Sequence, residues 1–206
     1  PSVSQSVNTI LPANSKHTDK AQTAVQFCAK IWLAGMALML GYMVISWLHL
    51  KGRVKMSVPT DAALDGGGTK ISQKIYQSDA IESPFLFGII KPRIYIPNRV
   101  DSDALFYVVL HEMTHLKRKD HLVKPAGFVL LSVYWFNPLV WAAYIMLCRD
   151  IELICDEKVV RQLGSSCKKA YSQALLNSTV NRRVIAACPV AFGEVSVKER
   201  VKNVLD

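Results

Sequence analysis

The apolar and polar positions divide the chain into segments with different surroundings. Residues 31–50, IWLAGMALMLGYMVISWLHL, contain no charged side chain, and Lys51, Arg53 and Lys55 follow at once. A run of this length is enough for a helix to cross the ~30 Å hydrocarbon core of a bilayer. Basic residues gather on the cytoplasmic side of membrane helices. The pattern therefore predicts a transmembrane helix over residues 26–50, with the following chain in the cytoplasm.

The chain on either side of this helix is more polar. The segment 1–25 is rich in Ser, Thr and Asn. Beyond the helix, three glycines at 66–68 indicate a flexible loop or linker. The runs KIYQSD, PFLFGII and RIYIP then lie between residues 70 and 97 and have the composition of short strands, with Lys91-Pro92 as a turn. We therefore predict a small sheet after the linker.

A helix is expected directly after this sheet. Asp101 is a natural N-cap, and Asp103 would lie in the first turn, where an acidic side chain is favourable. Apolar residues then recur at helical spacing as far as about Lys117. They are Leu105, Val108, Val109, Met113 and Leu116.

A second uncharged run, residues 125–148, is also long enough to span a bilayer. Asn137-Pro138 interrupts it, because Asn is a good N-cap and Pro suits the first position of a helix. We therefore predict two antiparallel helices, one from about Pro125 to Phe136 and the other from Pro138 onward. Two placements of this hairpin, in the protein core or dipping into the membrane, are compatible with the sequence.

Composition adds to this picture. Half of the residues are hydrophobic and the net charge is +9, while the mean hydropathy of +0.19 is high for a soluble domain. This combination suits contact with an anionic membrane surface. No basic stripe with interleaved aromatic residues is present, so direct binding of nucleic acid is not expected. The five cysteines are odd in number and lack C-x-x-C spacing, which favours reduced thiols.

The motif HEMTH, residues 111–115, carries the candidate chemistry. His111 and His115 are four residues apart, so on a helix both imidazoles project from one face. Glu112 follows the first histidine, which completes the H-E-x-x-H pattern of zinc hydrolases. The chain is therefore expected to have an α+β, zincin-like fold. It would be mainly helical, with a small sheet before the motif helix and a transmembrane helix at the N-terminal end.

Two residues are candidates for the third zinc ligand. His121 has the spacing of the metzincin pattern, but that pattern needs a glycine where Arg118 stands. Glu152 is four residues before Asp156, which places two carboxylates on the apolar face of one helix. Such a pair is costly unless it is paired or binds metal. Glu152 is favoured as the ligand, and Asp156 could accept the N–H of a ligating imidazole.

This ligand set predicts an enzyme. Two imidazoles and one carboxylate leave one position of a tetrahedral zinc open for water, as in catalytic sites. Glu112 is then the general base that takes the proton of the water and passes it to the leaving amine. An extended peptide could add to the edge of the sheet. The expected activity is peptide-bond hydrolysis with one zinc ion.

Several motifs together resemble those of a known family. They are SPFLFG (83–88), HEMTH (111–115), WFNPLVW (135–141), ELICDE (152–157) and FGEVSVKERV (192–201). The combination closely resembles the BlaR/MecR family of membrane zinc metalloproteases, which are antirepressors that relay a beta-lactam signal. The resemblance covers about residues 25–206.

The resemblance implies a role for each site residue. His111, His115 and Glu152 would be the zinc ligands, Glu112 the catalytic residue, and Asp156 the partner of a ligand histidine. Residues 51–206 would then form a cytoplasmic zinc metalloprotease domain.

The resemblance also implies a setting in the cell membrane. The implied partners are membrane lipid and a protein substrate, either the chain itself or a cytoplasmic transcriptional repressor.

Two alternative functions are compatible with the zinc motif. A housekeeping membrane metalloprotease can also pair H-E-x-x-H with E-x-x-x-D, although WFNPLVW argues against it. A signalling module could use the metal only for structure, but such a site has no use for Glu112.

Overall fold

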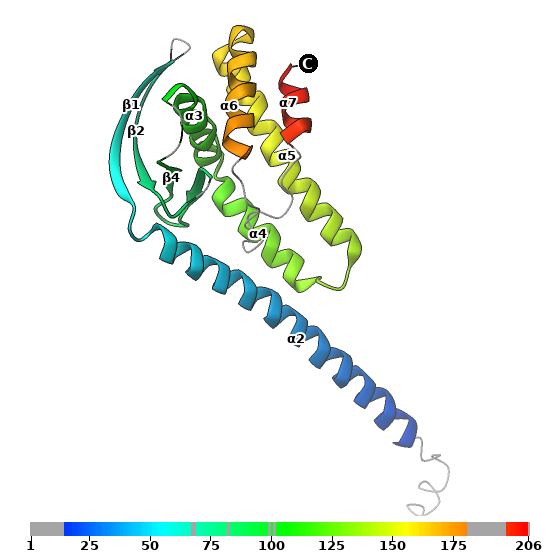
Figure 1. The fold of residues 1–206 in the computed structure, drawn as a ribbon. Helices are drawn as coiled ribbons and strands as arrows, with labels where there is room; N and C mark the ends of the chain where they lie inside the picture. Colours follow the sequence, from blue (N-terminus) through cyan, green and yellow to red (C-terminus); the bar gives the residue numbers. More distant parts are fainter. Residues whose placement is uncertain are drawn as a thin grey trace, which may run out of the picture.

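The helices of this chain lie on one side of a small sheet, and one of them extends far beyond the rest. The computed structural model describes residues 15–66, 69–81, 83–98, 100, 102–180 and 197–205. Figure 1 shows the long helix α2 (Ser15–Val54) running away from a body made of a curved sheet and a group of helices. This mainly helical arrangement, with the sheet preceding the motif helix, confirms the predicted fold class.

Helix α2 contains the predicted transmembrane segment but is longer than expected. It begins at Ser15 rather than at residue 26, and no glycine or proline between Ser15 and Val25 interrupts the backbone. Over Lys20–Val54 it is the one helix among the described residues that is long and apolar enough to cross a membrane. Little of this stretch is buried against the rest of the protein.

The sheet has four strands, one more than the sequence predicts. The strands are β1 (Val58–Gly66), β2 (Thr69–Ser78), β3 (Phe85–Phe87) and β4 (Arg93–Pro97). Their order is β1-β2-β4-β3, with β2 and β4 parallel and the other pairs antiparallel. The prediction of a flexible loop or linker at residues 66–68 is wrong for Gly66, because this residue is the last of β1 and pairs with Thr69 of β2. Gly67 and Gly68 lie outside the described residues.

The motif helix α3 (Ser102–Arg118) follows β4 and lies between the sheet and the other helices (Figure 1). Its predicted N-cap, Asp101, lies outside the described residues. The main core joins β2 and β4 to α3 and to the helices packed behind it. Its buried members include Ile75, Ile94, Ile96, Phe106, Val109, Leu110, Val159, Tyr171 and Leu175. The sheet and the rear helices thus hold α3 from two sides.

The predicted helical hairpin is present as α4 (Asp120–Val133) and α5 (Pro138–Leu163). The side chain of Asn137 accepts a hydrogen bond from the backbone N–H of Leu139 at 2.9 Å, so the N-cap is confirmed. Helix α4 begins at Asp120 rather than near Pro125. This early start follows from Lys119, whose left-handed backbone (φ 61°) ends α3 and begins α4 at once.

Two further helices complete the described chain. Helix α6 (Lys168–Val180) follows a short 3-10 turn (Ser165–Cys167) and packs on α3. Helix α7 (Val197–Leu205) packs on α5 and α6. Helix α7 therefore lies against the same helix that carries Glu152.

Candidate metal centre

Two imidazoles on α3 face one another inside the protein. His111 and His115 are buried, and their Nε2 atoms are 3.1 Å apart. Their position on one face follows from the four-residue spacing within a helix. Two donor atoms at about 2.0–2.1 Å from one tetrahedral zinc are separated by about 3.3 Å. The pair therefore has the spacing of two ligands of a single ion.

The return of the chain through α5 brings a carboxylate to the same point. Glu152 Oε2 is 3.5 Å from His111 Nε2, and Glu152 Oε1 is 3.6 Å from His115 Nε2. The Lys124 ammonium group donates to Oε1 at 2.9 Å. Burial raises the pKa of Glu152, but Lys124 and the two histidines lower it more, so that it lies well below its usual range. Glu152 is thus held as an anion beside both imidazoles.

A second side chain of α5 competes with Glu152 for the third position. The ligand atoms of His111, His115 and Cys155 all lie within 4.8 Å of one another. The Cys155 thiol is fully buried and donates to the backbone oxygen of His111 at 3.5 Å. The carboxylate oxygens of Glu152 lie 3.5 and 3.6 Å from the Nε2 atoms of His111 and His115. Both distances are within the same 4.8 Å. The donor set fits zinc with either residue.

The outer nitrogen of His115 has a partner that the sequence did not reveal. His115 Nδ1 lies 2.8 Å from Asp120 Oδ2, and Arg118 also donates to this carboxylate. Burial lowers the pKa of His115, but the hydrogen bond to Asp120 raises it, and the net shift is well upward. A carboxylate in this position orients a ligating imidazole and increases its basicity. Asp120 reaches His115 only because the chain turns at Lys119.

The outer nitrogen of His111 meets a buried polar group. His111 Nδ1 is 2.9 Å from the hydroxyl of Tyr171 and 3.3 Å from Asp156 Oδ1. The Tyr171 hydroxyl donates to Asp156 Oδ1 at 2.6 Å. The structure therefore brings Asp156 to a motif histidine, as the sequence predicts. Tyr171, which comes from α6, was not predicted, because no local pattern links it to residues 60 positions earlier.

Helix α7 adds a buried guanidinium group to the site. Arg200 is only 6% exposed and donates to both oxygens of Asp156, at 2.7 and 2.8 Å. Its nitrogens also lie 3.4 Å from Glu152 Oε2 and 3.3 Å from His111 Nε2. Burial raises the pKa of Asp156, but the hydrogen bond from Arg200 lowers it more, to well below its usual range. Arg200 belongs to the motif FGEVSVKERV (192–201), which supports the family resemblance but predicts no role for this residue.

The two remaining predicted candidates differ in their placement. Glu112 lies on α3 next to His111 and is buried, with 8% exposure. His121 lies in the first turn of α4, and its Nδ1 atom has no hydrogen-bond partner among the described residues. No contact recorded for the described residues links His121 to the two motif histidines. The structure therefore brings Glu152, rather than His121, to the imidazole pair.

The contact between Arg200 and Asp156 predicts a measurable loss of stability. In Arg200→Ala, Asp156 remains buried without its charged partner, which typically costs about 3–5 kcal/mol. The matched control is Arg149→Ala, which removes the exposed ion pair between α5 and Glu199 of α7 and should cost no more than about 1 kcal/mol. Thermal unfolding of both variants in detergent measures the difference. Equal midpoints would contradict a buried pair that holds α7 on the site.

Comparison with known proteins identifies relatives over nearly the whole chain. The family model described as BlaR1 peptidase M56 matches residues 1–204. The chain is 31% identical to "Regulatory protein BlaR1" of Bacillus licheniformis over 211 residues, which cover 94% of this chain and 34% of that protein. It is 26% identical to "Methicillin resistance mecR1 protein" of Staphylococcus aureus over 193 residues, 84% of this chain and 32% of that protein. The chain thus spans about a third of the length of these curated relatives.

Proposed function

This chain belongs to the BlaR1 peptidase M56 family, and from that premise we propose that it is a membrane-anchored zinc endopeptidase. The observation that carries the proposal is the convergence of His111 and His115 from α3 with Glu152 from α5. Two imidazoles and a carboxylate form a typical catalytic zinc set with one open position. The neighbouring Glu112 is the residue that such a site needs for proton transfer.

One zinc ion, held by His111, His115 and Glu152, would supply a Lewis acid for the scissile carbonyl and a water molecule of lowered pKa. Glu112 accepts the proton of the attacking water and delivers it to the leaving amine. Asp120 fixes the ring of His115 through Nδ1.

Tyr171 and Asp156 together fix the ring of His111 through its Nδ1 atom. The side chains behind the ligands therefore hold them in place while Glu112 moves the proton.

The sheet offers a place for an extended substrate. Its edge strands are β1 and β3, and both contact the motif helix α3. Strand β3 pairs with β4, the strand that directly precedes α3 in the chain. A peptide added to an edge strand is held by main-chain hydrogen bonds, which do not depend on its sequence. We therefore assign substrate binding to the edge at β3 (Phe85–Phe87), which lies near the motif helix.

The proposed substrate is a cytoplasmic transcriptional repressor, the chain itself, or both. Support comes from the relatives, one named a regulatory protein and the other a methicillin resistance protein. Lys51 and Arg53 in the last turn of α2 support a cytoplasmic position for residues 51–206. The proposed setting is thus the inner surface of the cell membrane, in the signalling that these relatives serve.

Metal dependence tests the proposed activity. The chain is reconstituted in vesicles, stripped with a chelator and then given zinc, while mass spectrometry follows cleavage of the chain and of an added peptide library. We expect cleavage to stop on chelation and to return with zinc. His111→Ala should remain inactive when zinc is added, because one ligand is missing. Cleavage that persists in the stripped protein would contradict a metallopeptidase.

A further inference from the structure

We propose that the outer part of the α4–α5 hairpin, residues 125–148, lies in the hydrocarbon of the membrane beside α2 and returns to the side from which it enters. We call this segment the re-entrant hairpin. This proposal is independent of the catalytic proposal, because it concerns the position of residues 125–148 relative to the membrane and not the chemistry of the site. Four properties of the described residues support it.

The first property is the absence of charge over a long exposed surface. No charged residue occurs in the re-entrant hairpin, whereas Lys124 and Arg149 stand directly at its two ends. Many of its large apolar side chains are exposed in the isolated chain. They are Val129, Leu130, Phe136, Leu139, Ile145 and Met146, with Leu139 reaching 76%. Exposed apolar side chains gathered on one hairpin mark a site of contact with a membrane or with another protein.

The second property concerns the indole N–H groups at the end of the hairpin. Trp32 donates to the carbonyl of Val133 at 2.8 Å, Trp135 to the carbonyl of Trp32 at 3.2 Å, and Trp141 to the carbonyl of Trp135 at 2.7 Å. All three donors are therefore bound within the protein although this region is partly exposed. Hydrocarbon offers no acceptor, so polar groups at membrane depth must find partners in the protein.

The third property is that polar groups in and near the turn between α4 and α5 also form hydrogen bonds within the protein. The Asn137 side chain accepts from the backbone N–H of Leu139, and the backbone N–H of Asn137 donates to the carbonyl of Tyr134, both at 2.9 Å. The Ser132 hydroxyl donates to the carbonyl of Phe128 at 2.8 Å. Each of these bonds gives a polar group of the turn a partner within the protein, which hydrocarbon could not supply. The turn is thus compatible with a lipid-facing position.

The fourth property is contact with the candidate membrane helix. The buried residues Phe128, Leu131, Tyr144 and Cys148 form a cluster that packs on Met39, Tyr42 and Met43 of α2. At Gly35 the contact is so close that an added Cβ would lie 2.2 Å from the ring of Trp135. Because these contacts lie within the uncharged run of α2, a bilayer around α2 also surrounds the hairpin.

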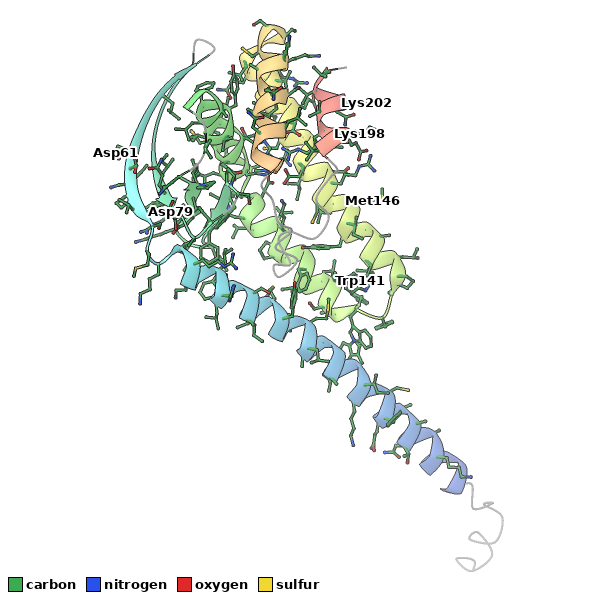
Figure 2. All side chains as sticks on the ribbon, viewed as in Figure 1. Asp61, Asp79, Trp141, Met146, Lys198 and Lys202 are labelled. Atoms are coloured by element: carbon green, nitrogen blue, oxygen red, sulfur yellow. The ribbon has the colours of Figure 1, made fainter. Side chains whose placement is uncertain are left out.

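The arrangement of the elements in space agrees with a position of the hairpin in the membrane. Figure 1 shows the turn of the hairpin beside the middle part of α2. In Figure 2, Trp141 and Met146 lie on the half of α5 that is nearer this turn, whereas the charged Asp61 and Lys198 lie on the sheet and on α7, away from it. The apolar hairpin and the charged surface thus occupy different ends of the protein.

The hairpin is too short to cross the bilayer, so it returns to the membrane surface from which it enters. The helical part of the first arm, from Pro125 to the end of α4 at Val133, extends about 14 Å, against a hydrocarbon thickness of about 30 Å. It therefore cannot cross. Both ends, at Lys124 and Arg149, remain at one surface, and the site between Lys124 and Glu152 is held next to the membrane. Substrate segments close to the bilayer are then the ones that reach it.

Spin labelling in phosphatidylcholine vesicles tests the placement. Exposed Cys28, half-buried Cys167 and Cys188 are replaced by serine. Single labels are introduced through Leu139→Cys and Met146→Cys, with Lys198→Cys on α7 as the matched exposed control. Collision rates with oxygen, which concentrates in hydrocarbon, and with a water-soluble nickel chelate are measured by electron paramagnetic resonance. We expect the oxygen-to-nickel ratio at 139 and 146 to exceed that at 198 several-fold.

Two results would overturn the proposal. High nickel collision at Leu139→Cys and Met146→Cys would place the hairpin in water. Protection from both reagents would mean that a second copy or another protein segment covers it. If a labelled variant does not fold, an apolar photolabel dissolved in the bilayer is applied to the unchanged chain. Peptide mapping should then find label in residues 125–148 and α2, and its absence from 125–148 would equally exclude lipid contact.

Discussion

Glu112→Gln is expected to abolish peptide cleavage while the protein keeps its zinc. The amide has nearly the shape of the carboxylate but cannot accept the proton of the attacking water. Loss of a general base typically lowers the rate by about a hundredfold to ten-thousandfold. Glu112 is on the same helix as His111 and His115 but is not a proposed zinc ligand. The zinc content of the variant should therefore equal that of the unchanged chain. Cleavage rate and bound zinc are measured on the same reconstituted preparation.

The control for this change is Glu157→Gln. Glu157 is an exposed carboxylate on α5 that pairs with Arg161, four residues later on the same helix. Its loss should leave both cleavage and zinc unchanged, because an exposed pair of this kind contributes little. Undiminished cleavage in Glu112→Gln with full zinc would refute the assigned role. It would favour a signalling module whose metal is structural.

Glu152→Ala is expected to empty the metal site. The change removes one of three ligands and leaves Lys124 without its ion-pair partner near the two imidazoles. Zinc bound by His111 and His115 alone would be lost during purification, and activity with it. The measurement is zinc per chain by elemental analysis, together with the dissociation constant from competition with a chromophoric chelator.

Two parallel variants make this test decisive. Cys155→Ser changes the other side chain near the imidazoles, and His121→Ala removes the candidate suggested by metzincin spacing. Both should retain zinc. An empty site in Cys155→Ser with zinc retained in Glu152→Ala would assign the third position to the thiol instead. Loss of zinc only in His121→Ala would refute the contribution of α5 to the site.

Local patterns in the sequence were sufficient to predict the helices that carry the candidate site. The spacing of His111 and His115 places them on one face wherever that stretch is helical, because an α-helix repeats every 3.6 residues. The hairpin turn was predicted for a similar reason, since Asn137 and Pro138 act on the backbone next to them. Each of these features depends on residues at most four apart.

The additional strand shows where local patterns fail. Strand β1 has the sequence VPTDAALDG, in which Pro, Asp, Ala and Gly are all uncommon in strands. It forms because β2 offers a complete row of backbone partners, from Val58 opposite Gln77 to Gly66 opposite Thr69. Its existence is decided by pairing with another segment.

Taken by itself, the sequence determined which residues are candidates for the chemistry and which helices are apolar, because both depend on short-range spacing and on charge. Only the tertiary structure decided what surrounds them. Tyr171 and Arg200 meet His111 from 60 and 89 positions away, and Asp120 meets His115 only after the turn at Lys119. Contacts of this kind have no periodicity along the chain. They arise from the way α6 and α7 pack on the core, which minimises exposed apolar surface and pairs the buried charges.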